Sequence, residues 1–297
     1  MRKAFIQLHV SILLAGFTGV LGKLISLNEG LLVWYRMLIS LVVMLLLSFL
    51  GIPRGGLRGK LPGRGARPGM MGVGVLLALH WVFFFGSIKA SNVSIGVVCF
   101  SLTSLFTALL EPLAYRRRIV GKDVLASLIP LAGILMIFHF EVRFRTGILL
   151  GIVSSLLAAL FTIANKEVAK ERPATLLLFY EMLGGCLSLS LLMPFYLARF
   201  PAAHIVPGLT DFLWLLVFAI CCTVWLYLLQ IEALKHISAF TLNLSYNLEP
   251  VYSILLAMLF LGEAKELSLS FYAGLGLIIL SVLLQTGNVL KRKRPTP

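Results

Sequence analysis

Charged residues are scarce in this chain of 297 residues. Asp, Glu, Lys and Arg make up only 13% of it, whereas 59% of the residues are hydrophobic and the mean hydropathy is +0.98. Soluble globular domains carry about 25% charged residues, so this composition excludes an ordinary soluble fold. The chain is expected to be an integral membrane protein.

Acidic residues and catalytic motifs are also few. The chain has two aspartates, Asp123 and Asp211, and no DDxxD, HExxH, HxxxH or GxSxG sequence, which argues against an intramembrane enzyme such as a lipid transferase. It also lacks the GxxxxGK(S/T) loop that binds nucleotide phosphates, so any energy for transport would come from gradients. We therefore expect no enzymatic activity, no cofactor and no metal.

The four cysteines indicate neither a disulfide framework nor a metal site. Each of them falls inside an apolar run, where a cysteine behaves as a small buried hydrophobic residue. They are Cys99, Cys186, Cys221 and Cys222.

Long apolar runs dominate what is present. A helix needs about 20 residues to cross a hydrocarbon core of about 30 Å, and ten runs approach that length. Barrel strands would alternate apolar and polar residues, so helices are expected. The first run exceeds the core of a secretory signal and is expected to be retained. The predicted spans are 4–26, 31–50, 69–88, 93–115, 121–140, 146–168, 174–197, 211–234, 238–262 and 267–288.

The net charge of +14 does not indicate nucleic-acid binding, because the basic residues sit in alternate loops. Nineteen lie on one side of the predicted spans, against five on the other, which are Lys89, Arg143, Arg145, Arg199 and Lys265. By the positive-inside rule, both termini are expected in the cytoplasm, and the number of spans is expected to be even. The nineteen are Arg2, Lys3, Arg54, Arg58, Lys60, Arg64, Arg67, Arg116, Arg117, Arg118, Lys122, Lys166, Lys170, Arg172, Lys235, Lys291, Arg292, Lys293 and Arg294.

The two halves of the chain resemble each other at a shift of about 144 residues. Trp81 then aligns with Trp225, Ser101 with Ser245, and Lys23 with Lys166 at a nearby shift. Five spans per half is an odd number, so the second copy must enter the membrane with opposite polarity. The sequence thus predicts an all-α protein of ten transmembrane helices in an inverted 5+5 repeat. The expected units are residues 1–140, residues 141–290 and a basic cytoplasmic tail, residues 291–297.

A charged position recurs within the repeat with its sign reversed. VWYRML contains Arg36, and LFYEML, 145 residues later, contains Glu181. Charges inside spans are rare and tend to be paired or to border a water-filled cavity. We expect both to act as gate residues at mirrored depths and not to touch each other. Glu29 or helix-end carbonyls are the expected partners of Arg36, and Lys166 or Lys170 those of Glu181.

Two segments carry a resemblance to a known family. NVSIGVVCFSLTSLFTALLEPL and HISAFTLNLSYNLEPVYSILLAMLFLGE resemble the EamA-type permeases of the drug/metabolite transporter superfamily. The strongest part runs from Glu249-Pro250 to Leu261-Gly262-Glu263, whereas the first half departs from the pattern at Phe106 and at Arg117-Arg118-Ile119. The resemblance implies an inner-membrane carrier, often an exporter of amino acids or related metabolites.

The ninth predicted span has the most polar face. Asn243, Tyr246, Asn247 and Pro250 lie on one side of the helix, with Glu249 beside them. Pro250 has no amide hydrogen, which frees the carbonyl of Tyr246 near mid-span. Either this face lines a substrate cavity, or its polar groups bond neighbouring helices.

Three further sets of residues are candidates for the site or its surroundings. In the fourth span, Ser101 and Ser104 share a stripe with Glu111, whose partners are expected among Arg116 to Arg118. Trp81 and Trp225, with His80 and Tyr227, are candidate aromatic walls or simple membrane filler. Gln230 and Glu232 are expected at a helix end, in water.

The sequence therefore predicts a secondary transporter that exports a small organic metabolite, an amino acid or a related compound, by alternating access. Its partners would be that metabolite and the lipid bilayer, with no nucleic acid. Proton coupling through Glu249, or through Glu111 or Glu181, and facilitated exchange both remain open. The alternative is a flippase for lipid or lipid-linked substrates, which would have a cavity open sideways to the bilayer.

Overall fold

The computed structural model describes residues 2–50, 67–140, 142–170, 172–265, 267–277 and 279–280, and this part of the chain is helical with no strand. Its α-helices are α1 (Arg2–Leu24), α2 (Glu29–Phe49), α3 (Arg67–Ala90), α4 (Val93–Phe100), α5 (Thr103–Ala114), α6 (Gly121–Phe140), α7 (Arg145–Ala169), α8 (Ala174–Arg199), α9 (Leu209–Ala219), α10 (Leu226–Leu234), α11 (Ala239–Tyr246) and α12 (Glu249–Leu261). A π-helical segment, η3 (Ile220–Trp225), joins α9 to α10, and short 3₁₀ turns, η2 (Val142–Phe144) and η4 (Glu263–Lys265), precede α7 and follow α12.

Eight helical stretches in the described residues are long and apolar enough to cross a membrane. They are Lys3–Leu24, Glu29–Phe49, Arg67–Ala90, Val93–Ala114, Val142–Ala169, Ala174–Arg199, Leu209–Leu234 and Ala239–Leu261. Each coincides with a predicted span. The predicted fifth span, 121–140, is occupied by α6. Of the predicted tenth span, 267–288, the structure describes residues 267–277 and 279–280, and residues 269–277 are helical.

Two of the spans are broken near their middle. Between α4 and α5, the amides of Ser101 and Leu102 bond carbonyls only three residues back, and the same pattern recurs at Asn247 and Leu248 between α11 and α12. The second break is the one expected from Pro250, which sits in the first turn of α12. The first break has no proline and was not predicted.

The two broken spans match at an offset of 146 residues rather than 144. α4 and α11 are both eight residues long, beginning at Val93 and Ala239. The side chains of Asn92 and Ser238 cap their first turns by accepting hydrogen bonds from the amides of Ile95 and Thr241. The two halves thus repeat local structure that the sparse sequence identities revealed only approximately.

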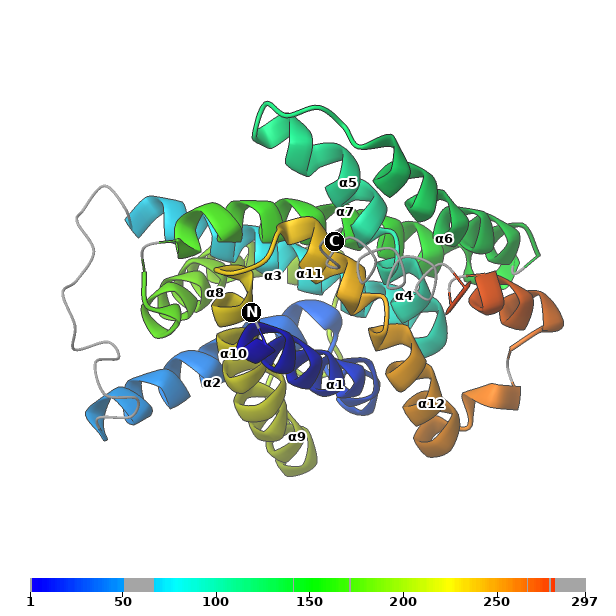
Figure 1. Cartoon of the computed structure of the whole chain (residues 1–297). Coiled ribbons are helices and arrows are strands. Elements are labelled where there is room, and N and C mark those ends of the chain that lie inside the picture. The colour runs from blue at the N-terminus through cyan, green and yellow to red at the C-terminus, as the bar shows by residue number, and fades with distance from the viewer. Residues whose placement is uncertain are drawn as a thin grey trace.

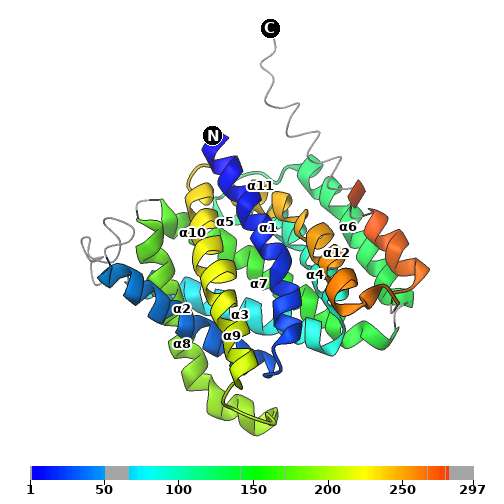
Figure 2. The same ribbon diagram turned by 90° about the horizontal axis from the view of Figure 1, so that it is seen from below.

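The halves of the chain pack around one another in the helix bundle (Figure 1). α1 from the first half crosses between α10 and α12 of the second (Figure 2). α3 packs along α7 and α8. Glycine allows the backbones of α3 and α8 to approach each other closely, because a Cβ at Gly74 would overlap the carbonyl oxygen of Glu181 and a Cβ at Gly184 would overlap that of Met71. Helices from both halves therefore enclose the centre of the molecule.

Candidate functional site

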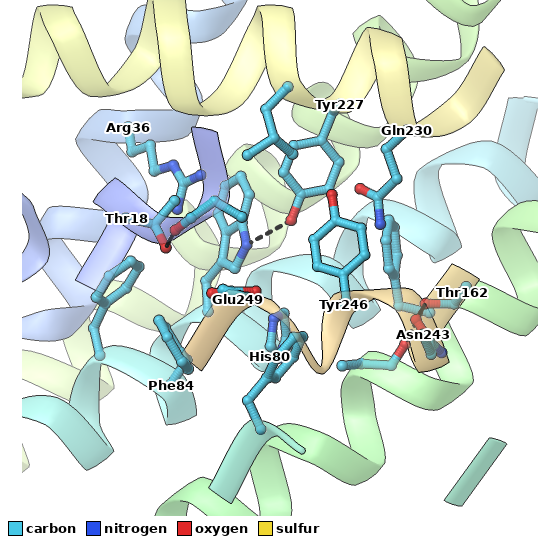
Figure 3. Close-up of a pocket in the computed structure, with 17 residues that line it drawn as sticks. Thr18, Arg36, His80, Phe84, Thr162, Tyr227, Gln230, Asn243, Tyr246 and Glu249 are labelled. Carbon is cyan, nitrogen blue, oxygen red and sulfur yellow. Dashed lines mark hydrogen bonds between the residues drawn. The ribbon is translucent and has the colours of Figure 1, made fainter. Parts of the chain in front are cut away.

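A cavity lies at this centre, where helices of both halves meet (Figure 3). Its volume is about 50 Å³, which leaves room for only a few water molecules. Polar groups and aromatic rings share its wall. The lining residues are Ala15, Thr18, Arg36, His80, Trp81, Phe84, Phe85, Phe100, Ala158, Phe161, Thr162, Leu226, Tyr227, Gln230, Asn243, Tyr246 and Glu249.

Arg36 is the cation of the cavity and is only 1% exposed. Its Nε donates to Thr223 Oγ1 and its Nη2 to the carbonyl of Cys222, both at 2.7 Å. The π-helical turn explains why Cys222 can accept this bond, because such a turn interrupts the regular hydrogen-bond ladder of a helix. The rings of Trp81 and Phe218 lie 3.6 and 4.0 Å from the guanidinium carbon, so the group is held by cation–π contacts as well.

The expected pairing of Arg36 with Glu29 is wrong. Glu29 accepts a hydrogen bond of 2.6 Å from the hydroxyl of Tyr196 instead. The expected carbonyl partner is present, but it belongs to a π-turn within a span and not to a helix end. Arg36 therefore faces the central cavity.

Glu249 supplies an acidic group to the same cavity as Arg36. It begins α12, directly after the break in the ninth predicted span, and is 4% exposed. In Figure 3, Arg36, Thr18 and Glu249 gather toward one end of the cavity, and Gln230, Asn243 and Thr162 toward the other. One permanent cation and one carboxyl group thus share a small, largely apolar chamber.

Gln230 is a site residue that sequence reasoning misplaced. It was expected in water at a helix end, yet it is buried and lines the cavity, and its Oε1 has no hydrogen-bond partner among the described residues. An unpartnered buried acceptor is costly. This oxygen is therefore available to a donor group of a bound molecule. Glu232, two residues further along α10, has a side chain that is 40% exposed and pairs with Lys235 at 2.7 Å.

Trp81 and Tyr227 form the aromatic centre of the cavity wall. The indole Nε1 of Trp81 donates to the hydroxyl of Tyr227 at 3.0 Å, and the two rings meet edge to face. They are equivalent positions of the two halves at the offset of 146. Trp225, which aligns with Trp81 at the offset of 144, is 53% exposed and does not line the cavity, whereas Tyr227, the other aromatic candidate of this span, does.

The polar residues of the broken spans divide into cavity and packing groups. Asn243 and Tyr246 line the cavity, and Asn243 also bonds Thr107 and Thr162 across helices. Asn247 instead donates to Ser104 Oγ at 3.2 Å behind the cavity wall. The Oγ of Ser101 is buried without a partner in the described part of the chain. Asn247, Ser104 and Ser101, three of the predicted site residues, therefore lie where the two breaks meet and not in the cavity wall.

Glu111 and Glu263 cap the broken helices of the opposite half. The carboxylate of Glu111, near the end of α5, accepts hydrogen bonds from the first amides of α11, at Ala239 and Phe240. The carboxylate of Glu263, after α12, accepts them from the first amides of α4, at Val93 and Ser94. The expectation that Glu111 pairs with Arg116 to Arg118 is wrong, because a helix N-terminus competes for its charge.

Lys23 and Lys166 hold the turns that lead into the same two helices. Lys23 Nζ donates to the carbonyls of Ile88 and Ser91, before α4. Lys166 Nζ donates to the carbonyls of Leu234 and Ile237, before α11. The four acceptors correspond at the offset of 146. Lysine therefore fastens the turn before each broken helix, and glutamate caps the helix itself.

Glu181 does not have the partners that the sequence suggested. Lys166 is engaged as described, and Lys170 pairs with Glu167 at 2.7 Å. Glu181 is completely buried in α8, and neither of its carboxyl oxygens has a hydrogen-bond partner among the described residues. It is absent from the cavity lining.

The fold and site together define a multi-pass helical membrane protein built from two related halves around a central cavity that contains an arginine and a glutamate. Residues 2–139 and again residues 145–287 match the EamA-like transporter family, and the chain belongs to that family.

Two relatives support this assignment. The uncharacterized transporter YxxF of Bacillus subtilis (strain 168) is 26% identical over 215 residues, which cover 70% of this chain and 65% of that protein, just under two thirds of its length. An uncharacterized transporter of Archaeoglobus fulgidus is 26% identical over 214 residues, covering 72% and 74%. A protein of known crystal structure superposes with a TM-score of 0.68 over 99% of both chains, and at 20% identity this likeness shows the fold alone.

Proposed function

We propose that the protein is a secondary transporter of small zwitterionic metabolites, amino acids or related compounds. The observation that carries this proposal is the placement of Arg36 and Glu249 in one buried cavity between the two halves. Charged groups inside a membrane protein are costly and are found where a substrate or ion passes. A cation and a carboxyl group together suit a molecule that carries both charges.

The geometry suggests how such a molecule is held. Arg36 uses Nε and Nη2 for protein contacts, which leaves its Nη1 side for a substrate carboxylate. Glu249 and the unpartnered Oε1 of Gln230 are acceptors for an ammonium group. The rings of Phe84, Phe100 and other aromatic residues would surround an apolar side chain.

We propose that substrate moves by alternating access in an inverted 5+5 repeat of ten helices, with both termini in the cytoplasm of an inner membrane. The present cavity is too small for a metabolite, so binding requires the helices to move apart. The turn before each broken helix has its own lysine, and each broken helix has a carboxylate cap from the other half. In an inverted repeat, the two sets would lie at opposite faces and serve as matched gates. Outward transport is the direction that the family resemblance implies.

Metabolite profiling tests the function. Cells that overproduce the protein should release one or a few amino acids or related compounds into the medium, and cells without it should retain them. Cells that produce Arg36→Ala at the same membrane level should behave as cells without the protein. Release that is unaffected by Arg36→Ala would contradict the proposed site. A change confined to lipids would favour a flippase.

A further inference from the structure

Glu181 is a buried acidic residue that does not line the central cavity. It lies in the second turn of α8, it is 0% exposed, and both carboxyl oxygens lack a partner in the described residues. A carboxylate buried without a hydrogen bond or a cation is strongly disfavoured relative to the neutral acid. In this conformation the side chain is therefore expected to hold a proton.

The charged and titratable groups around α8 are engaged elsewhere. α8 packs against α2, α3, α7 and α10, and Tyr227 of α10 interacts with Glu181 electrostatically without bonding it. The groups with other bonding, ionic or ring partners are Glu29, Tyr35 and Arg36 of α2, Arg67, His80 and Lys89 of α3, Arg145, Lys166, Glu167 and Lys170 of α7, and Tyr227, Glu232 and Lys235 at α10. None of them neutralises a charge on Glu181.

Glu181 also sits on a contact between the two halves. α2 and α3 belong to the first matched segment and α8 to the second. Gly74, Gly184 and Gly185 bring the backbones so close that no side-chain carbon would fit at Gly74 or Gly184. Water is excluded while this contact is closed. A movement that separates α3 from α8 would expose the carboxyl group to water.

We propose that Glu181 is a proton-binding site that couples proton movement to the movement of the halves, an inference that rests on the alternating access proposed above. While α3 and α8 are in contact, the carboxyl group keeps its proton. When they part, its O–H bond breaks, the proton passes to entering water, and the carboxylate remains on α8. Closure requires a proton to be taken up from water again.

Infrared spectroscopy of the purified full-length protein in lipid tests the bound proton without any substrate. At neutral pH, the wild type should show the carbonyl-stretch band of a protonated carboxylic acid. Glu181→Gln should lose that band, whereas Glu181→Asp should retain one. Glu232→Gln is the matched control at a half-buried carboxylate that is paired with Lys235, and it should leave the band unchanged. Loss of a carboxylate band in Glu181→Gln, instead of an acid band, would overturn the proposal.

Proteoliposomes test the coupling. With a mixture of the common amino acids on one side and a pH-sensitive dye inside, the wild type should change the internal pH as it moves amino acids. Glu181→Gln should still move them with loss of the pH change, because its amide mimics the protonated acid. An undiminished pH change in this variant would contradict the coupling. Failure of the wild type to move any amino acid would contradict the proposed substrate class, and the infrared band decides the proton site independently.

Discussion

Arg36 shows why a residue in the right place can still have unforeseen partners. An arginine within an apolar run indicates a functional position, because its charge cannot be left unpaired in lipid. Its actual partners are a threonine and a carbonyl in a π-turn of the eighth predicted span, together with two aromatic rings. No local sequence pattern predicts a π-turn, so the hydrogen-bond partners of Arg36 could not be predicted from the sequence.

Replacing Arg36 with lysine tests the planar guanidinium. Lysine keeps the positive charge, but it cannot stack between two rings while donating in two fixed directions. A charge-assisted hydrogen bond contributes about 1.5–3 kcal/mol, so transport of the identified metabolite should fall roughly 10- to 100-fold in kcat/KM. Arg199→Lys, at the exposed end of α8, is the control and should transport normally. Equal activity of the two variants would show that only charge matters at Arg36.

Asn243 and Asn247 provide a second test at the scale of single residues, because Asn243 lines the cavity and Asn247 does not. Asn243→Leu should abolish transport while normal amounts of protein reach the membrane. Asn247→Leu should retain transport and lower the thermal stability, since it loses a hydrogen bond to Ser104 that contributes about 1 kcal/mol. Loss of transport in both variants at normal stability would place Asn247 in the site after all.

At the scale of helices, the contact between α3 and α8 depends on a missing side chain. Gly74 lies against the backbone of Glu181, whereas Gly72, two residues earlier on the same helix, has open space around it. The two glycines are therefore a matched pair in which only one is required by packing.

Gly74→Ala should prevent α3 and α8 from closing, because a methyl group would overlap a backbone oxygen that cannot move independently. We expect a large loss of thermal stability or of folded protein in membranes. Gly72→Ala should be neutral or gain about 0.5–1 kcal/mol from the higher helix propensity of alanine. Thermal denaturation of the two purified variants checks this, and similar melting temperatures would mean that the contact is looser than described.

At the scale of the whole molecule, the lengths of the apolar runs predicted the spans well. The sequence predicted the partners of the charged side chains poorly. Eight predicted spans coincide with helices long and apolar enough to cross a membrane, and the family expected from the Glu249 to Glu263 region is confirmed. The sequence aligned Trp81 with Trp225 at an offset of about 144, whereas at the structural offset of 146 Trp81 matches Tyr227, and of these two wall candidates only Tyr227 lines the cavity. Pairing was missed because it joins residues far apart in the chain, as Glu263 and Val93 are.

Topology remains a prediction that reporter fusions can check. The nineteen basic residues on one side, against five on the other, predict that fusions after Arg67, Arg118 and Pro297 all report a cytoplasmic location. A fusion after Lys89, in a loop of the opposite side, is the control and should report the outer location. An outer location at the C-terminus would require an odd number of spans and would rule out the inverted 5+5 arrangement.

The helix caps that each half provides to the other bear on which substitutions this protein tolerates. Glu111 completes a helix of the second half, and Glu263 completes one of the first. A substitution at either glutamate therefore harms the half in which it does not occur, and selection must act on the two copies jointly. Neither half can therefore be removed without leaving an uncapped helix in the other.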